Sequence, residues 1–207
     1  KATSSAMSTS TRCDWTSSIR SRSRNWWRRP DVFRSGVSGV TVKKYLDFLE
    51  NAFLITVLHP WHGKIAKRLV KSPKVYVRDS GLLHGLLHLD FYDDLLGHPS
   101  LGASWEGYVI EQVRAVAGDR LEIFYYRTHN GAECDLVLVK AGRPVAAAEI
   151  KFSSTPDISR GLHISIADLE TAHNFVIVPQ GDDYPLSSTI EVVSLRTFLE
   201  KHLPGLW

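Results

Sequence analysis

The sequence predicts a mixed fold of the α/β (α+β) class, and three observations in its C-terminal half support this prediction. Residues 103–118 place apolar side chains at helical spacing and end on a glycine. Strand-like segments rich in β-branched and aromatic residues follow between 121 and 152. A second helical segment at 160–172 precedes an apolar run at 174–179 that is closed by a proline. The order helix, three strands, helix, strand therefore predicts one domain over residues 101–207.

Composition and charge limit the classes of protein to which the chain can belong. With 207 residues, of which 43% are hydrophobic, it can bury the core of one large domain or two small ones. The longest apolar run, residues 53–58, is far shorter than the roughly 20 residues that span a bilayer, so we expect no membrane partner. The N-terminus lacks the apolar segment of a secretory signal, and two cysteines do not indicate a disulfide framework. We therefore expect a cytoplasmic protein in a reducing compartment.

Residues 1–35 differ from the rest of the chain in composition. Eight basic and two acidic side chains give residues 1–34 a net charge of +6, so the remaining residues carry −3. Ser, Thr, Arg and Trp are frequent here, without helical or strand periodicity. One interpretation is a basic arm that contacts nucleic acid. We favour the other, a disordered or non-native segment such as the product of an out-of-frame start, because no apolar pattern is present.

Residues 36–62 suggest part of a winged-helix unit. A Gly/Ser-rich turn leads into apolar positions at helical spacing over 42–49, and residues 53–60 predict a strand. In the second half of a winged helix, this helix would offer Lys43 and Lys44 to nucleic-acid phosphates. An ordinary packed helix with two solvated lysines remains the alternative.

Residues 63–100 predict a linker that contains a basic cluster, a strand over 74–79 and a helix after it. The cluster either faces nucleic acid or is a solvated surface, and we assign phosphate contact to Lys71 and Lys74. Lys64 follows a glycine, but Ile rather than Ser or Thr comes next, so this chain contains no ATP site of the phosphate-loop type. The basic residues of the cluster are Lys64, Lys67, Arg68, Lys71 and Lys74.

Charged residues in and beside two otherwise apolar strands form the candidate site. If the turn between these strands centres near Gly142, residue i pairs with residue 284 − i, and Asp135 lies opposite Glu149; the neighbouring register remains open. Opposed side chains have Cβ atoms about 5 Å apart, so two carboxylates there need a cation or a proton between them. Lys151 lies two residues after Glu149 and points to the same side. We predict that Asp135 and Glu149 hold Mg²⁺, with Mn²⁺ as a substitute, while Lys151 assists a water or neutralises a phosphate.

Three further charged residues bear on this hypothesis. Glu106 lies within the preceding helix, where it can face the site as an auxiliary acid, although Glu111 is on the same helix. Arg127, at the end of the first strand, can pair with a phosphate or a carboxylate. We expect Glu133 to be exposed, on the face opposite Asp135. An ordinary solvated ion pair is the alternative explanation for the Glu-x-Lys doublet.

Taken together, several stretches of the chain resemble the domain of unknown function 4143, the C-terminal domain of prokaryotic AAA-type ATPases. They run in family order over residues 36–207. No ATPase domain is present in this sequence, and residues 1–35 do not resemble the first winged-helix helices of that family. We therefore expect a truncated or frame-disrupted product. The matching stretches are "TVKKYLDFLENAFLITVLHPW", "KSPKVYVRDSGLLHGLL", "GASWEGYVIEQV", "FYYRTHNGAECDLVLV" and "AAEIKFS".

The resemblance implies a restriction-endonuclease-like PD-(D/E)XK fold for residues 101–207. It also implies that Glu106 is the helix acid, that Asp135 is the metal-binding aspartate, and that Glu149 and Lys151 form the E-x-K pair. Proteins with this pattern commonly hydrolyse phosphodiesters with Mg²⁺. The function that we expect is therefore that of a nuclease-like, DNA-associated domain.

Two other functions remain open at this point. One is a non-catalytic regulatory module that binds DNA or a protein, with an ATPase domain or protein as its partner. The other is a fragment without independent activity.

Overall fold

The computed structural model describes residues 39–63, 69–153 and 155–207. The expectations for residues 1–35 and for the basic side chains within 64–68 lie outside the described residues. The described part of the chain has a mixed α+β fold, as predicted. No helix in it is long and apolar enough to cross a membrane.

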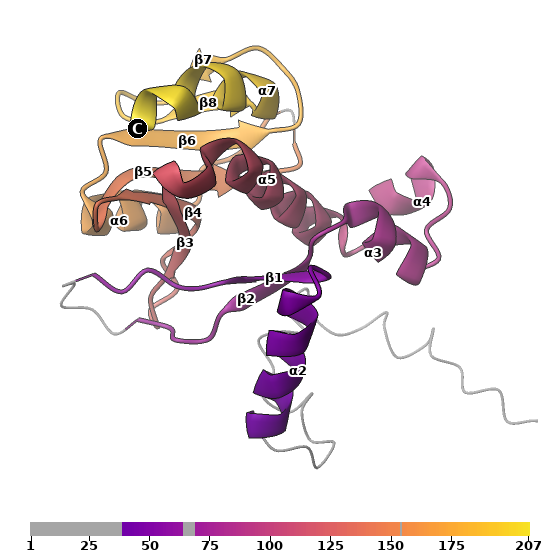
Figure 1. The fold of residues 1–207 in the computed structure, drawn as a ribbon. Helices are drawn as coiled ribbons and strands as arrows, with labels where there is room; N and C mark the ends of the chain where they lie inside the picture. Colours follow the sequence, from indigo (N-terminus) through magenta and orange to yellow (C-terminus); the bar gives the residue numbers. More distant parts are fainter. Residues whose placement is uncertain (1–38, 64–68, 154) are drawn as a thin grey trace, which may run out of the picture. The chain divides into compact units, whose positions relative to one another are not determined.

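A mixed sheet forms the centre of the C-terminal region (Figure 1). Strand β4 (Glu133–Lys140) is antiparallel to both β3 (Glu122–Arg127) and β5 (Arg143–Ile150). Strand β6 (His173–Val178) runs parallel to both β5 and β8 (Glu191–Ser194). The predicted order of helix, three strands, helix and strand is confirmed. In spatial order, the strands are β3 (Glu122–Arg127), β4 (Glu133–Lys140), β5 (Arg143–Ile150), β6 (His173–Val178), β8 (Glu191–Ser194) and the short edge strand β7 (Tyr184–Pro185).

Helices cover both faces of this sheet because successive strand residues alternate between two cores. Helix α5 (Leu101–Ala117) packs on one face, against Leu136 and Ala148, together with helical turns near the C-terminus. Helix α6 (Arg160–Leu169) packs on the other face, against Val137 and Ala147. The turns near the C-terminus are α7 (Leu195–Thr197), the π-helical η4 (Phe198–His202) and η5 (Leu203–Leu206), and the short η3 (Gly118–Arg120) follows α5. Gly118 ends α5 with a positive φ of 55°, as the sequence predicts.

The region before α5 contains a two-stranded antiparallel sheet. Helix α2 (Gly39–Asn51) leads into β1 (Ile55–Leu58), which pairs with β2 (Lys74–Val77) across the division expected between residues 62 and 63. Helices α3 (Ser80–Leu86) and α4 (Tyr92–Leu96) then connect β2 to α5.

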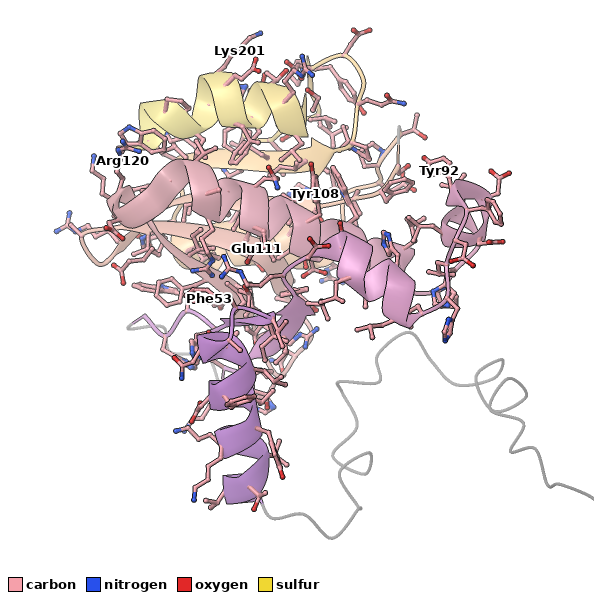
Figure 2. All side chains as sticks on the ribbon, turned by 45° about the vertical axis from the view of Figure 1, so that its right-hand side comes forward. Phe53, Tyr92, Tyr108, Glu111, Arg120 and Lys201 are labelled. Carbon is pink, nitrogen blue, oxygen red and sulfur yellow. The ribbon has the colours of Figure 1, made fainter. Side chains whose placement is uncertain are left out.

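Contacts with Glu111 of α5 tie this small sheet to the C-terminal region. Figure 2 labels Glu111 beside the end of α2, where Phe53 is also labelled. Thr56 of β1 donates a hydrogen bond to one oxygen of Glu111, and Arg78, just after β2, donates to the other at 2.8 Å. Glu111 therefore has a structural role, and Glu106 is the acid of α5 that remains for the candidate site.

The β4–β5 hairpin has the predicted register from Leu136 to Leu138, whereas the two pairs next to the turn are shifted by one residue. Leu136 pairs with Ala148, and their residue numbers add up to the predicted 284. Continuing this pairing by one residue brings Asp135 and Glu149 next to each other on adjacent strands. The turn residues Ala141 and Gly142 both have positive φ, of 48° and 75°, which is typical of a two-residue hairpin turn.

Candidate active site

A β-bulge sets the position of Asp135. Phe124 pairs with Val137 and Tyr126 pairs with Cys134, so two residues of β4, one of them Asp135, lie opposite the single residue between them on β3. The Oδ2 atom of Asp135 accepts a hydrogen bond from the backbone N–H of Ile150 at 3.1 Å. Because Ile150 lies between Glu149 and Lys151, the aspartate contacts the backbone of the Glu-x-Lys segment directly.

Lys74 of β2 occupies the space among three carboxylates. Its Nζ lies 2.6 Å from Glu106 Oε1, 3.0 Å from Asp135 Oδ1 and 3.1 Å from Glu133 Oε1. The Lys74 side chain is only 7% exposed, and its ammonium also lies 5.2 Å from the centre of the Tyr125 ring. The prediction that Lys74 contacts nucleic-acid phosphate from a surface cluster is therefore not supported, because its ammonium is buried and paired within the protein.

Tyr76 holds β2 against α5 beside Lys74. Residues two apart on a strand point to the same side, so both Tyr76 and Lys74 reach Glu106. The Tyr76 hydroxyl donates to the same Oε1 atom that accepts from Lys74. Gly107 makes this approach feasible, since a Cβ at that position would lie 3.0 Å from Cδ1 of Tyr76.

Glu133 also lies on the Lys74 side of the sheet, which corrects the expectation that it is exposed on the face opposite Asp135. Arg127, its partner in the β3–β4 pairing, donates to it from Nε at 2.9 Å and from Nη2 at 2.6 Å. This bidentate geometry is strong and orients both side chains. Arg127 is thus paired with a carboxylate, one of the two partners that the sequence allowed.

Glu149 is held by a different set of donors. Lys151 Nζ lies 2.7 Å from Glu149 Oε1, and the Ser159 hydroxyl donates to Oε2 at 3.1 Å. Ser159 is the N-cap of α6 and also accepts from the N–H of Leu162, so the start of α6 positions Glu149. Glu106, Glu133, Asp135 and Glu149 are called the carboxylate cluster below.

The charges of this cluster affect one another. Burial acts to raise the pKa of Asp135, but the Lys74 ammonium and the Ile150 N–H outweigh it and lower that pKa below its ordinary value. Burial and the negative charge of Asp135 raise the pKa of Glu106 to about 7, against the effect of Lys74. Burial acts to lower the pKa of Lys74, but Asp135 and Glu106 raise it well above its ordinary value, so the ammonium stays charged.

The donor set fits a hard divalent cation in its chemistry, since carboxylate oxygens are the ligands that Mg²⁺ and Mn²⁺ prefer. All four carboxylate oxygens of Asp135 and Glu149, however, accept from protein donors: Lys74, Ile150, Lys151 and Ser159. Within the part of the chain that the structure describes, no three His, Cys, Asp or Glu side chains meet at the spacing of metal ligands. The carboxylates are thus ligands of a suitable type whose present partners are two lysines, a backbone N–H and a serine hydroxyl.

The other predicted phosphate-binding residues do not join this cluster. Lys43 and Lys44 are exposed on α2, and Lys71 is exposed before β2. Tyr76 and Ser159 contact the cluster but were not among the predicted site residues. Tyr76 could have been found from its spacing of two from Lys74 on a predicted strand. The sequence gives no comparable indication for Ser159.

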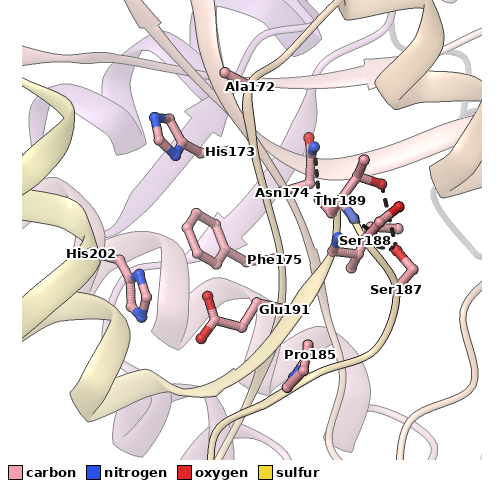
Figure 3. A pocket seen from close by; sticks show the side chains of 11 residues that line it. Ala172, His173, Asn174, Phe175, Pro185, Ser187, Ser188, Thr189, Glu191 and His202 are labelled. Carbon is pink, nitrogen blue, oxygen red and sulfur yellow. Dashed lines mark hydrogen bonds between the residues drawn. The ribbon is translucent and has the colours of Figure 1, made fainter.

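A separate pocket of about 270 Å³ lies at the other end of the sheet and contains no residue of the carboxylate cluster (Figure 3). His173, at the start of β6, pairs with Ala146, whereas Ile150 pairs with Ile177 at the opposite end. Four residues along a strand correspond to about 13 Å. The Asn174 side chain donates to the backbone carbonyl of Thr189 and so fixes the loop that borders the pocket.

Comparison with protein families assigns the cluster and its lysine to different regions. Residues 101–198 match the model of a domain of unknown function, DUF4143. All four members of the carboxylate cluster lie within this DUF4143 region, as do Arg127 and Lys151. Residues 29–93 match a second domain of unknown function, DUF8612. Lys74 and Tyr76 lie in that region, so the DUF8612 region supplies the ammonium that the DUF4143 region binds.

Two mycobacterial proteins are similar to this chain in sequence. They are the uncharacterized proteins Mb2031c of Mycobacterium bovis and Rv2008c of Mycobacterium tuberculosis, each 43% identical over 157 residues. The alignment covers 76% of this chain but 35% of each relative, so it spans about a third of the length of those relatives. No solved structure shows significant similarity to this chain.

Proposed function

We propose that the DUF4143 region is a nuclease-like domain of the PD-(D/E)XK type that acts on the phosphodiester bonds of DNA. The observation that carries this proposal is the hydrogen bond from the Ile150 N–H to Asp135. It joins the aspartate of β4 to the Glu149-Ile150-Lys151 segment at the end of β5, which is the arrangement that the D and E-x-K elements require. The order of α5, three antiparallel strands, α6 and a parallel strand supports a restriction-endonuclease-like topology.

Each residue has a distinct role in this proposal. Asp135 and Glu149 would hold Mg²⁺, or Mn²⁺ in its place, which when bound supplies a water of lowered pKa and stabilises charge on the phosphate. Lys151 is half-buried, and its ammonium lies near Glu149, Asp135 and Glu106. It would orient a water or neutralise a phosphate oxygen. Glu106 would serve as an auxiliary acid on α5.

Exposed lysines on α2 give DNA a second point of contact in this proposal. The succession of α2, β1 and β2, a helix followed by an antiparallel pair, agrees with the second half of a winged helix. Lys43 and Lys44 would contact phosphates there, and their contribution should weaken as salt rises.

Cleavage of plasmid and single-stranded DNA by the purified chain, with Mg²⁺ or Mn²⁺, tests the catalytic role. We expect wild type and Lys140→Ala to cleave equally, because Lys140 is an exposed lysine at the end of β4. Lys151→Ala should reduce the rate by about 100-fold or more. Equal cleavage by wild type and Lys151→Ala, or no cleavage by wild type, would reject it.

The position of Lys74 favours a second candidate, a non-catalytic module that binds DNA or a protein. An ammonium that already contacts three carboxylates leaves the cluster neutralised in large part without a metal. DNA binding that is steep in salt but unchanged by chelation of divalent cations would support this candidate. If no DNA is bound at low salt, a protein partner such as an ATPase becomes the better explanation.

A further inference from the structure

Lys74 is a cation from outside the DUF4143 region that lies in its carboxylate cluster. The ammonium contacts Glu106, Glu133 and Asp135 at 2.6–3.1 Å. Glu133 has a second cation in Arg127, and Glu149 has Lys151. Asp135 and Glu106 therefore depend on Lys74 for their closest positive charge.

The strand that carries Lys74 is docked on both sides of that lysine. Two residues after Lys74, the Tyr76 hydroxyl donates to Glu106. Two residues before Lys74, the backbone carbonyl of Ser72 accepts from the Tyr125 hydroxyl. On β2 itself, Lys74 pairs with Leu58 of β1, which is fully buried. The docked strand of the DUF8612 region therefore fixes the position of the Lys74 ammonium, which does not move freely as a surface lysine would.

A divalent cation at Asp135 would encounter this ammonium at close range. Asp135 Oδ1 accepts a hydrogen bond from Lys74 Nζ at 3.0 Å, and a metal–carboxylate bond is about 2.1 Å long. A metal ion bound to this oxygen would therefore lie next to the Lys74 ammonium. Repulsion between like charges is strong where most side-chain surface is excluded from water.

We propose that Lys74 and a divalent cation compete for Asp135, so that Lys74 determines the metal affinity of the cluster. Movement of β2 away from α5 would then raise metal affinity, and metal binding would displace the ammonium. The DUF8612 region thereby controls the site of the DUF4143 region. This inference rests on the proposed function for the choice of Asp135 as a metal ligand.

Binding of Mn²⁺ to the full chain, followed by electron paramagnetic resonance of the free ion, tests the competition. We expect Lys74→Met to bind Mn²⁺ at least about tenfold more tightly than wild type. Lys71→Met should match wild type, since that lysine is exposed. Lys74→Met combined with Asp135→Asn should lose the gain. A folded Lys74→Met chain without tighter binding, or a gain that survives Asp135→Asn, would overturn the proposal.

A measurement on the wild-type chain keeps the proposal testable if Lys74→Met does not fold. Acetylation of lysines by an N-hydroxysuccinimide ester, read by peptide mass spectrometry, reports access to each ammonium. We expect Lys74 to react slowly, and faster by at least about threefold at saturating Mn²⁺, because competition is reciprocal. Lys71 is the internal reference. An unchanged rate at Lys74 while Mn²⁺ is bound would overturn the proposal.

The outcomes separate this inference from the proposed function. Tighter Mn²⁺ binding by Lys74→Met without DNA cleavage by any variant would reject the nuclease activity and retain the competition. Metal-dependent cleavage by wild type, together with equal Mn²⁺ affinity in wild type and Lys74→Met, would support the nuclease activity and reject the competition.

Discussion

Replacing Lys74 with methionine should destabilise the fold, even though methionine fills a similar volume. The substitution removes the ammonium that contacts Glu106, Glu133 and Asp135, and it leaves those carboxylates in place. Glu133 retains Arg127 as a partner. The cost therefore arises mainly from Glu106 and Asp135, which lose their closest cation while they remain largely buried.

The size of this effect follows from the burial of the partners. Breaking a buried ion pair by removing one member costs about 3–5 kcal/mol. The Lys74 side chain is 7% exposed, while Glu106 and Asp135 are 16% and 17% exposed, so residual hydration reduces the penalty. We expect the free energy of unfolding to fall by about 3 kcal/mol at neutral pH.

Urea unfolding of the full chain, followed by far-UV circular dichroism, measures this change. Lys71→Met is the matched control and should change stability by no more than about 0.5 kcal/mol. The double variant Lys74→Met/Asp135→Asn should recover about 1–2 kcal/mol relative to Lys74→Met, because it removes one uncompensated charge. A loss below about 1 kcal/mol for Lys74→Met, or strict additivity in the double variant, would refute the reasoning.

Three further predictions concern the surroundings of the cluster. Gly107→Ala should destabilise by about 1–2 kcal/mol despite the better helix propensity of alanine, because its Cβ would meet Tyr76 at 3.0 Å; urea unfolding measures it, and a stabilised variant would contradict it. Burial raises the pKa of the fully buried Cys134, so its alkylation by iodoacetamide at pH 8, followed by peptide mass spectrometry, should be about 100-fold slower in the native chain than in urea. Equal rates would show that Cys134 is accessible. The pKa of Glu106 is raised from 4.5 to about 7, so its contribution to stability is present below pH 4.5 and is lost as the pH rises through about 7. Glu106→Gln should therefore reduce the decline in stability over this pH range, and an identical pH profile in wild type would contradict the raised pKa.

The hairpin register was predictable from the sequence, although two local features combine to produce it. The turn at Ala141–Gly142 pairs Lys140 with Arg143, a sum of 283. An irregularity near Pro144 then adds one residue to β5, and the sum becomes 284 from Leu138 onwards. Proline has no N–H for the ladder, which favours a bulge at this point. Centring the turn on Gly142 therefore predicts the correct pairs for Leu136–Leu138 but not for Val139 and Lys140.

The role of Lys74 could not be predicted because it depends on tertiary structure. In the sequence, Lys74 is the last of several closely spaced basic residues, which is typical of a solvated surface. Its burial results from the docking of β2 on α5, where Lys74 meets Glu106, 32 residues further along the chain. The position of Glu133, by contrast, was predictable. It precedes Asp135 by two residues, and side chains two apart on a strand lie on the same face.

A crystal structure of the wild-type chain, grown once in a chelator and once in Mn²⁺, tests the central claim most directly. In the chelator, we predict Lys74 Nζ within about 3.2 Å of Glu106, Glu133 and Asp135. In Mn²⁺, we predict a metal bound to Asp135 and Glu149, with the ammonium displaced from Asp135. A lysine that points into solvent in the chelator, or a metal bound beside an unmoved Lys74, would contradict the account.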